Sequence, residues 1–223
     1  MISRKDMKPI KERYNKRLED FGYSQKSVGW GEKARQDLRY EVLANYFNLK
    51  NKSVLDLGAG FGDGVKIFSK YRIKKYLGLE INENFIGIGN DIYGKIYKNC
   101  LFSLEYADIS KNKNYVNADL VVGSGIFNSK FQSSNNYHFI EQTIKKSIKA
   151  CKVGIAFNFI DDQTDFKEDY IFYANVGKVV EIIQKYSRKF FIKKDYFPFE
   201  FSVFVHKDDS FSKKTSIFKN PLY

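Results

Sequence analysis

The chain has 223 residues, of which 43% are hydrophobic and 17% aromatic, and its formal net charge is +12 at pH 7. This length lets one domain bury a substantial core, and the two distant cysteines, Cys100 and Cys151, exclude a disulfide scaffold and favour a reducing compartment. No apolar run is long enough for a signal peptide or a membrane span, so we expect a cytoplasmic protein without a membrane partner.

The N-terminal quarter predicts helices. We expect residues 1–9 to be flexible, a basic helix over about 8–19 and an amphipathic helix over about 32–48. In one domain overall, these helices of residues 1–50 would cap the mouth of a sheet region spanning residues 51–207. A flexible tail is expected over residues 208–223.

From residue 53 onward, short β-rich runs alternate with helical periodicity. We predict strands at 53–57, 75–81, 101–106, 118–122, 152–159, 189–196 and 200–206, and helices at 64–71, 83–93, 137–150 and 176–186. The alternation indicates a doubly wound α/β sheet of seven strands, mostly parallel. Only a short turn around Pro198 separates the last two strands, so they form an antiparallel hairpin.

The first strand runs into a helix through a glycine-rich turn that contains Gly58, Ala59 and Gly60. Glycines there permit a tight turn and a close approach of the backbone to a ligand. A dinucleotide fingerprint needs glycine where Asp63 stands, and Asp56 precedes the turn, so two carboxylates would repel a pyrophosphate. S-adenosylmethionine carries a sulfonium and an ammonium but no phosphate, so the turn predicts this cofactor.

The next two strands each lead to a carboxylate. Glu80, followed by Ile81, ends the second strand at the place where a carboxylate can accept from both ribose hydroxyls. Asp108 follows the third strand, where it could accept from the adenine amino group while Ile109 packs against the ring. A helix cap or a solvated loop acid is the ordinary alternative for each residue.

Two side chains ahead of the sheet are candidates to contact the cofactor. Trp30, the only tryptophan, lies between two glycines in a segment that could cover the ligand. Arg39 could hold the methionine carboxylate through its paired donors, with Arg35 as the competing choice one turn earlier.

The catalytic candidates lie on the C-terminal half. His138, near the start of the predicted helix 137–150, is the better general base of the two histidines, although a surface or capping role is the commoner one. Asn158 and Asp161, in and after the fifth strand, could orient a hydroxyl or an amine. No cluster of ligands predicts a metal.

The segments 56–62, Glu80, Asp108 and 118–124 together resemble the successive motifs of the class I S-adenosylmethionine-dependent methyltransferases. The resemblance spans about residues 53–206 and implies a Rossmann-like sheet. It also implies that Gly123, after the fourth strand, belongs to the cofactor site.

A narrower resemblance extends into the flanks of the chain. The chain is similar to a bacterial subgroup of small-molecule methyltransferases at residues 28–31, Gln36, 39–40, 124–128 and 156–159, and at the Asp195-Tyr196 pair followed by Glu200-Phe201. That subgroup has histidine where this chain has Lys194.

These features predict methyl transfer to oxygen or nitrogen of a small metabolite, releasing S-adenosylhomocysteine. By analogy to the subgroup, the acceptor would be a sugar or nucleotide-sugar of glycan synthesis. An RNA methyltransferase, motivated by the net charge, and a non-catalytic binding protein are the alternatives. The even spread of lysines and the lack of an RNA-binding appendage favour a small-molecule acceptor and no specific nucleic acid.

Overall fold

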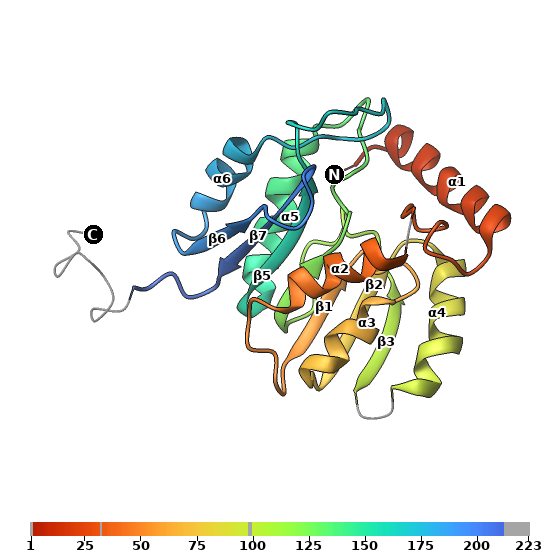
Figure 1. Ribbon diagram of the computed structural model, residues 1–223, viewed down its shortest axis with the longest axis horizontal. Helices are drawn as coiled ribbons and strands as arrows, with labels where there is room; N and C mark the ends of the chain where they lie inside the picture. The colour runs from red at the N-terminus through yellow and green to blue at the C-terminus, as the bar shows by residue number, and fades with distance from the viewer. Residues whose placement is uncertain (1, 32, 98–99, 212–223) are drawn as a thin grey trace.

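Seven strands form one sheet in the order β3-β2-β1-β4-β5-β7-β6. The computed structural model describes residues 2–31, 33–97 and 100–211 (Figure 1). The strands are β1 (Ser53–Leu57), β2 (Lys75–Glu80), β3 (Leu101–Tyr106), β4 (Ala118–Gly123), β5 (Cys151–Ile160), β6 (Phe190–Lys193) and β7 (Glu200–His206). Strands β1 to β5 pair in parallel, and β7 runs antiparallel between β5 and β6. The predicted α/β class and the terminal hairpin are confirmed.

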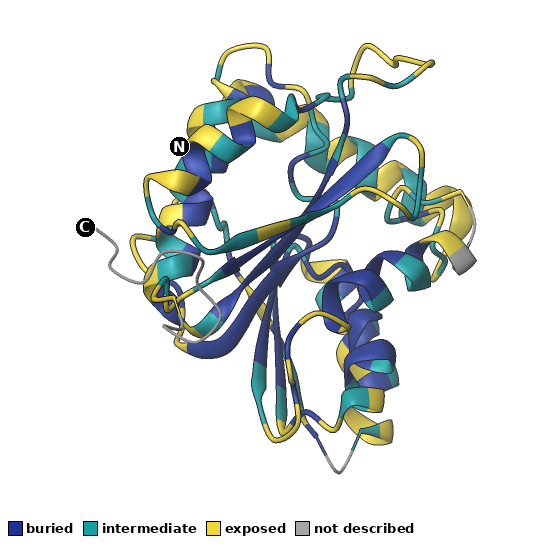
Figure 2. Cartoon of the chain, turned by 60° about the vertical axis from the view of Figure 1, so that its left-hand side comes forward, coloured by how far each residue is buried: buried dark blue, intermediate teal, exposed yellow. Residues whose placement is uncertain are grey.

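Helices cover both faces of the sheet. They are α1 (Arg4–Phe21), α2 (Lys33–Ala44), α3 (Gly64–Phe68), α4 (Glu83–Ile96), α5 (Asn136–Ala150) and α6 (Val176–Gln184), with the 3-10 helix η1 (Ser69–Tyr71) after α3. Figure 2 shows the buried strands in dark blue at the centre, between helices whose outer faces are yellow. Among the described residues, no helix is long and apolar enough to cross a membrane.

The core is divided by the sheet into two apolar layers, because neighbouring residues of a strand point to opposite faces. Leu55 of β1 and Ile155 of β5 pack with α5 and α6, whereas Val54 and Ala156 pack with α2 and α3. A strand buried on both faces reads as an unbroken apolar run, which is why the central strands were readily predicted.

The N-terminus differs most from the prediction. Instead of a flexible segment over residues 1–9, Ile2 is buried in the core and α1 begins at Arg4. Ser3 caps the helix by accepting from the backbone N–H of Asp6 at 3.1 Å. The Asp6 carboxylate in turn accepts from the backbone of Gln132 and Ser133, which ties the helix to the loop before α5.

Several other boundaries also shift. The predicted helix over 64–71 divides into α3 and η1, α2 ends at Ala44 rather than near residue 48, and β6 stops at Lys193 rather than at 196. Beyond β6 the chain bends into the hairpin turn, where the Glu200 N–H donates to the Phe197 carbonyl. Most of the predicted tail lies outside the described residues, which end at 211.

Candidate functional site

A cavity of about 240 Å³ opens at the carboxyl ends of β1 to β4, beneath helix α1. This is the edge at which ligands bind in open α/β sheets. Predicted cofactor residues on its wall are Trp30, Gly58, Ala59, Gly60, Glu80, Ile81, Asp108 and Ile109. The fold therefore brings one group of the predicted site residues together.

The floor of the cavity is the turn after β1. Gly58 and Gly60 have φ of 67° and 58°, a left-handed conformation that favours glycine. A Cβ on Gly58 would also lie 2.6 Å from Cγ2 of Ile126. Both positions therefore need glycine for the backbone to form this wall.

Glu80, at the end of the neighbouring strand β2, is hydrogen-bonded to the backbone of this turn. Its Oε2 accepts from the Gly60 N–H at 2.8 Å, and its Oε1 accepts from the N–H groups of Ile81 and Asn82 at 2.8 and 2.9 Å. Burial raises the pKa of Glu80, while these three backbone donors act in the opposite direction. A buried carboxylate is thus held rigidly on the cavity wall, with acceptor capacity left on Oε2 for a ligand hydroxyl.

Asp108 is the second carboxylate on the wall, at the end of β3. Its Oδ1 accepts from the Ser110 hydroxyl at 2.7 Å, and its Oδ2 pairs with Lys111 Nζ at 2.9 Å. Burial acts to raise the pKa of Asp108, but Lys111 and Ser110 outweigh it and the pKa is lowered. Asp108 is therefore an ionised acceptor beside Ile109.

Asp56 lies behind the turn rather than on the cavity wall. It is fully buried, and its Oδ2 accepts from the Tyr76 hydroxyl at 2.5 Å. Burial raises the pKa of Asp56 to about 7. The structure therefore gives Asp56 a place in the support of the turn, because β1 directs its side chain toward Tyr76 and away from the cavity.

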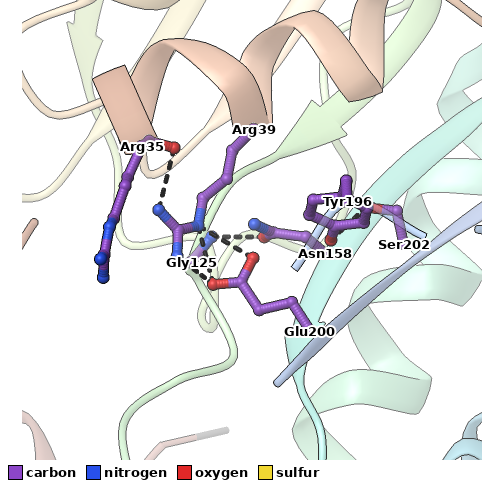
Figure 3. A network of polar contacts seen from close by, with 7 residues as sticks. All are labelled: Arg35, Arg39, Gly125, Asn158, Tyr196, Glu200 and Ser202. Atoms are coloured by element: carbon purple, nitrogen blue, oxygen red, sulfur yellow. Dashed lines mark hydrogen bonds and ion pairs between the residues drawn. The ribbon is translucent and has the colours of Figure 1, made fainter. Parts of the chain in front are cut away.

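Arg39 has a protein carboxylate as its partner (Figure 3). Its Nε donates to both oxygens of Glu200 at 2.8 and 2.9 Å, and Nη2 forms a further close contact with the same carboxylate. Nη1 donates to the Arg35 carbonyl, and the guanidinium lies 4.0 Å from the centre of the Trp30 ring. The Arg39 guanidinium, which we expected to bind the methionine carboxylate, is thus already paired with Glu200. The two residues are far apart in the sequence, so no local pattern indicated this pair.

Asn158 and Gly123 also lie behind the cavity surface. Asn158, buried in β5, accepts through Oδ1 from the Gly125 N–H at 2.8 Å (Figure 3). Gly125 does line the cavity, and a Cβ there would lie 2.8 Å from the Trp30 ring. Asn158 is thus placed to position the turn after β4, whereas a Cβ at Gly123 would lie 2.8 Å from Cδ1 of Ile126, which lines the cavity.

The two other catalytic candidates lie apart from the cavity wall. His138 is exposed on the first turn of α5, where its backbone N–H donates to the capping Asn135 side chain. Asp161 is completely buried and forms a close ion pair with Lys194. The ion pair gives Asp161 a structural role, whereas the helix cap uses only the backbone N–H of His138.

Helix α1 supplies cavity residues that the sequence analysis missed. Arg13, Tyr14 and Arg17 line the cavity from above, with Phe85 and Tyr170 from later segments. The sequence feature that indicates this lining is the helical spacing of Ile10, Tyr14 and Arg17, which places the three side chains on one face of the helix. The basic composition of helix 8–19 does not indicate that this face covers a cavity, because that depends on how the helix packs on the sheet.

No family model matches the chain, and no curated protein matches it. Solved structures share its fold. Magnesium protoporphyrin IX methyltransferase (ChlM) from Synechocystis PCC 6803, with bound SAH, aligns with a TM-score of 0.65 and 12% identity over 91% of this chain and 100% of that one. N-methyltransferase NodS from Bradyrhizobium japonicum WM9, also with SAH, aligns with 0.61 and 14% over 88% and 97%. DhpI, in a SAM-HEP complex, aligns with 0.64 and 11% over 92% and 99%.

Proposed function

We propose that this protein is an S-adenosylmethionine-dependent methyltransferase that acts on oxygen or nitrogen of a small metabolite. One observation carries the proposal: the buried Glu80 carboxylate, fixed by three backbone N–H groups, faces a cavity whose floor is the Gly58–Gly60 turn. The class I methyltransferase fold of the similar structures, several of them holding SAM or SAH, supports it.

The residues present fit this cofactor. Oε2 of Glu80 can accept from a ribose hydroxyl, Asp108 from the adenine amino group, and Ile109 can pack on the ring. Glu80 could serve the ribose of either class of cofactor, whereas Asp63, in place of the third glycine of the dinucleotide fingerprint, favours the phosphate-free one. The positions of Trp30, Ala59, Gly60 and Ile81 on the same wall agree with the proposed site.

When bound, the cofactor would supply an electrophilic methyl group on a sulfonium for transfer to an acceptor lone pair, with the sulfur as leaving group. The chain's contribution to this step is geometric. The turns at Gly58 and Gly125 and the ring of Trp30 fix the walls between which the acceptor atom approaches, and such positioning supplies much of the rate enhancement. The cavity wall offers the hydroxyl of Tyr14 to orient that atom.

Three finer assignments belong to this proposal. A sugar or nucleotide-sugar acceptor is based on the resemblance to the subgroup alone. The cytoplasmic location is supported by two buried, unpaired cysteines, Cys100 and Cys151. The helices within residues 1–50 act as a cap, since α1 and Trp30 line the cavity.

Calorimetry with S-adenosylhomocysteine and, separately, NADH tests the cofactor assignment. We expect the adenosyl ligand to bind and NADH to fail, and the reverse result would refute the proposal. Incubation of metabolite pools with labelled methyl donor then tests catalysis. Cofactor binding without label transfer to any acceptor would favour the non-catalytic alternative.

A further inference from the structure

The side chain of Arg13 lines the cavity from helix α1 without a carboxylate partner among the residues that the structure describes. Its Nη2 donates to the Ser129 hydroxyl at 3.0 Å, and its guanidinium carbon lies 5.0 Å from the centre of the Tyr170 ring. Its Nε is buried and has no hydrogen-bond partner in the described part of the chain. A guanidinium held in this way retains an unused donor and an uncompensated positive charge.

A second polar group that lines the same cavity is also unpartnered among the described residues. The hydroxyl oxygen of Ser124, just after β4, is buried, and no described residue hydrogen-bonds to it. Ser124 and Ser129 flank the turn at Gly125, on the loop that follows the strand next to β1. The lining around Ser129 therefore combines a cation with hydroxyl groups, and Glu80 and Asp108 line the same cavity at the ends of β2 and β3.

Leaving buried donors unpaired costs free energy, and an oxyanion would satisfy both the charge and the directional N–H groups of Arg13. We propose that the methyl acceptor carries a carboxylate or phosphate group that binds Arg13, with Ser124 and Ser129 as hydroxyl donors. This proposal rests on the proposed methyltransferase function and narrows its acceptor to small anionic molecules. The net charge of +12 supports it, because a positive field attracts such molecules.

The single tryptophan allows the test to be made by fluorescence, since Trp30 lies on the cavity wall. With the protein saturated by S-adenosylhomocysteine, phenyl phosphate, benzoate and the neutral benzyl alcohol are titrated separately. We expect at least one anion to bind about tenfold or more tightly than benzyl alcohol. The tighter of the two anions identifies a phosphate or a carboxylate as the recognised group.

Arg13→Gln should abolish this preference for anions, and Arg13→Lys, which keeps the charge but loses the fork, should restore part of it. Arg4→Gln is the matched control, because Arg4 is exposed on the same helix and its loss changes the net charge equally. Its anion affinities should stay within about twofold of the wild-type values, since exposed distant charges are screened.

Equal anion and alcohol binding by the wild-type protein, or equal effects of Arg13→Gln and Arg4→Gln, would overturn the proposal. A third contrary result is that Arg13→Gln weakens S-adenosylhomocysteine but not methylthioadenosine, because Arg13 would then serve the methionine carboxylate. If S-adenosylhomocysteine fails to bind the wild-type protein, the proposed function itself is wrong. Normal cofactor binding by Arg13→Gln also shows that the variant is folded.

Discussion

The backbone N–H of Gly60 donates a hydrogen bond of 2.8 Å to Oε2 of Glu80. This contact joins the turn after β1 to the carboxyl end of the adjacent strand β2. Glu80 therefore has two roles: its carboxylate shapes the glycine turn, and it also faces the cavity above that turn.

We expect Glu80→Gln to weaken S-adenosylhomocysteine binding by about 1–3 kcal/mol. An amide has one acceptor oxygen, so it cannot satisfy the three N–H groups that now meet the carboxylate and also accept from a ribose hydroxyl. Calorimetry measures the change. Glu83→Gln, on the exposed first turn of α4, is the matched control and should leave the affinity unchanged. Unchanged affinity in folded Glu80→Gln would remove Glu80 from the site.

The buried ion pair between Arg39 and Glu200 should contribute strongly to the free energy of unfolding. Arg39→Met would leave the Glu200 carboxylate buried without its cation, and we expect the free energy of unfolding to fall by about 3–5 kcal/mol. Urea denaturation measures this loss, and the double variant Arg39→Met/Glu200→Leu should recover part of it. Lys70→Met, which breaks the exposed pair with Glu41, should cost less than about 1 kcal/mol. Unchanged stability with lost cofactor affinity would instead return Arg39 to a ligand-binding role.

Asp56 should make stability depend on pH. Its pKa is raised from 3.8 to about 7 by burial, so the folded state binds a proton that the unfolded state releases. The contribution of this bound proton to the free energy of unfolding is fully present below about pH 4. It is lost as pH rises through about 7, and the total loss is at most about 4 kcal/mol. The neutral variant Asp56→Asn should lack it.

Urea denaturation of both proteins between about pH 5 and 8 isolates the Asp56 contribution, because the other titrating groups are common to them. Relative to Asp56→Asn, the wild-type protein should become less stable as pH rises across this interval. A constant difference between the two would show that Asp56 has an ordinary pKa in the folded state.

The sequence by itself determined the order of strands and helices, the terminal hairpin and the wall formed by Gly58, Gly60, Glu80 and Asp108. These features are local: a strand buried on both faces shows an apolar run, a left-handed turn needs glycine, and residues at the ends of parallel strands meet at one edge. Neighbouring β1, β2 and β3 then place the two carboxylates beside the turn.

Tertiary structure alone decided which polar side chains remain available to a ligand. Arg39 and Glu200 are 161 positions apart, and Asp161 and Lys194 follow different strands, β5 and β6, so no local pattern shows that each is paired. Helix α1 likewise reaches the cavity only because Ile2 and Asp6 attach its start to the core and the loop before α5. The sequence specifies the chemical groups of each side chain. The partner that neutralises a charge or accepts a hydrogen bond depends on how distant parts of the chain pack together.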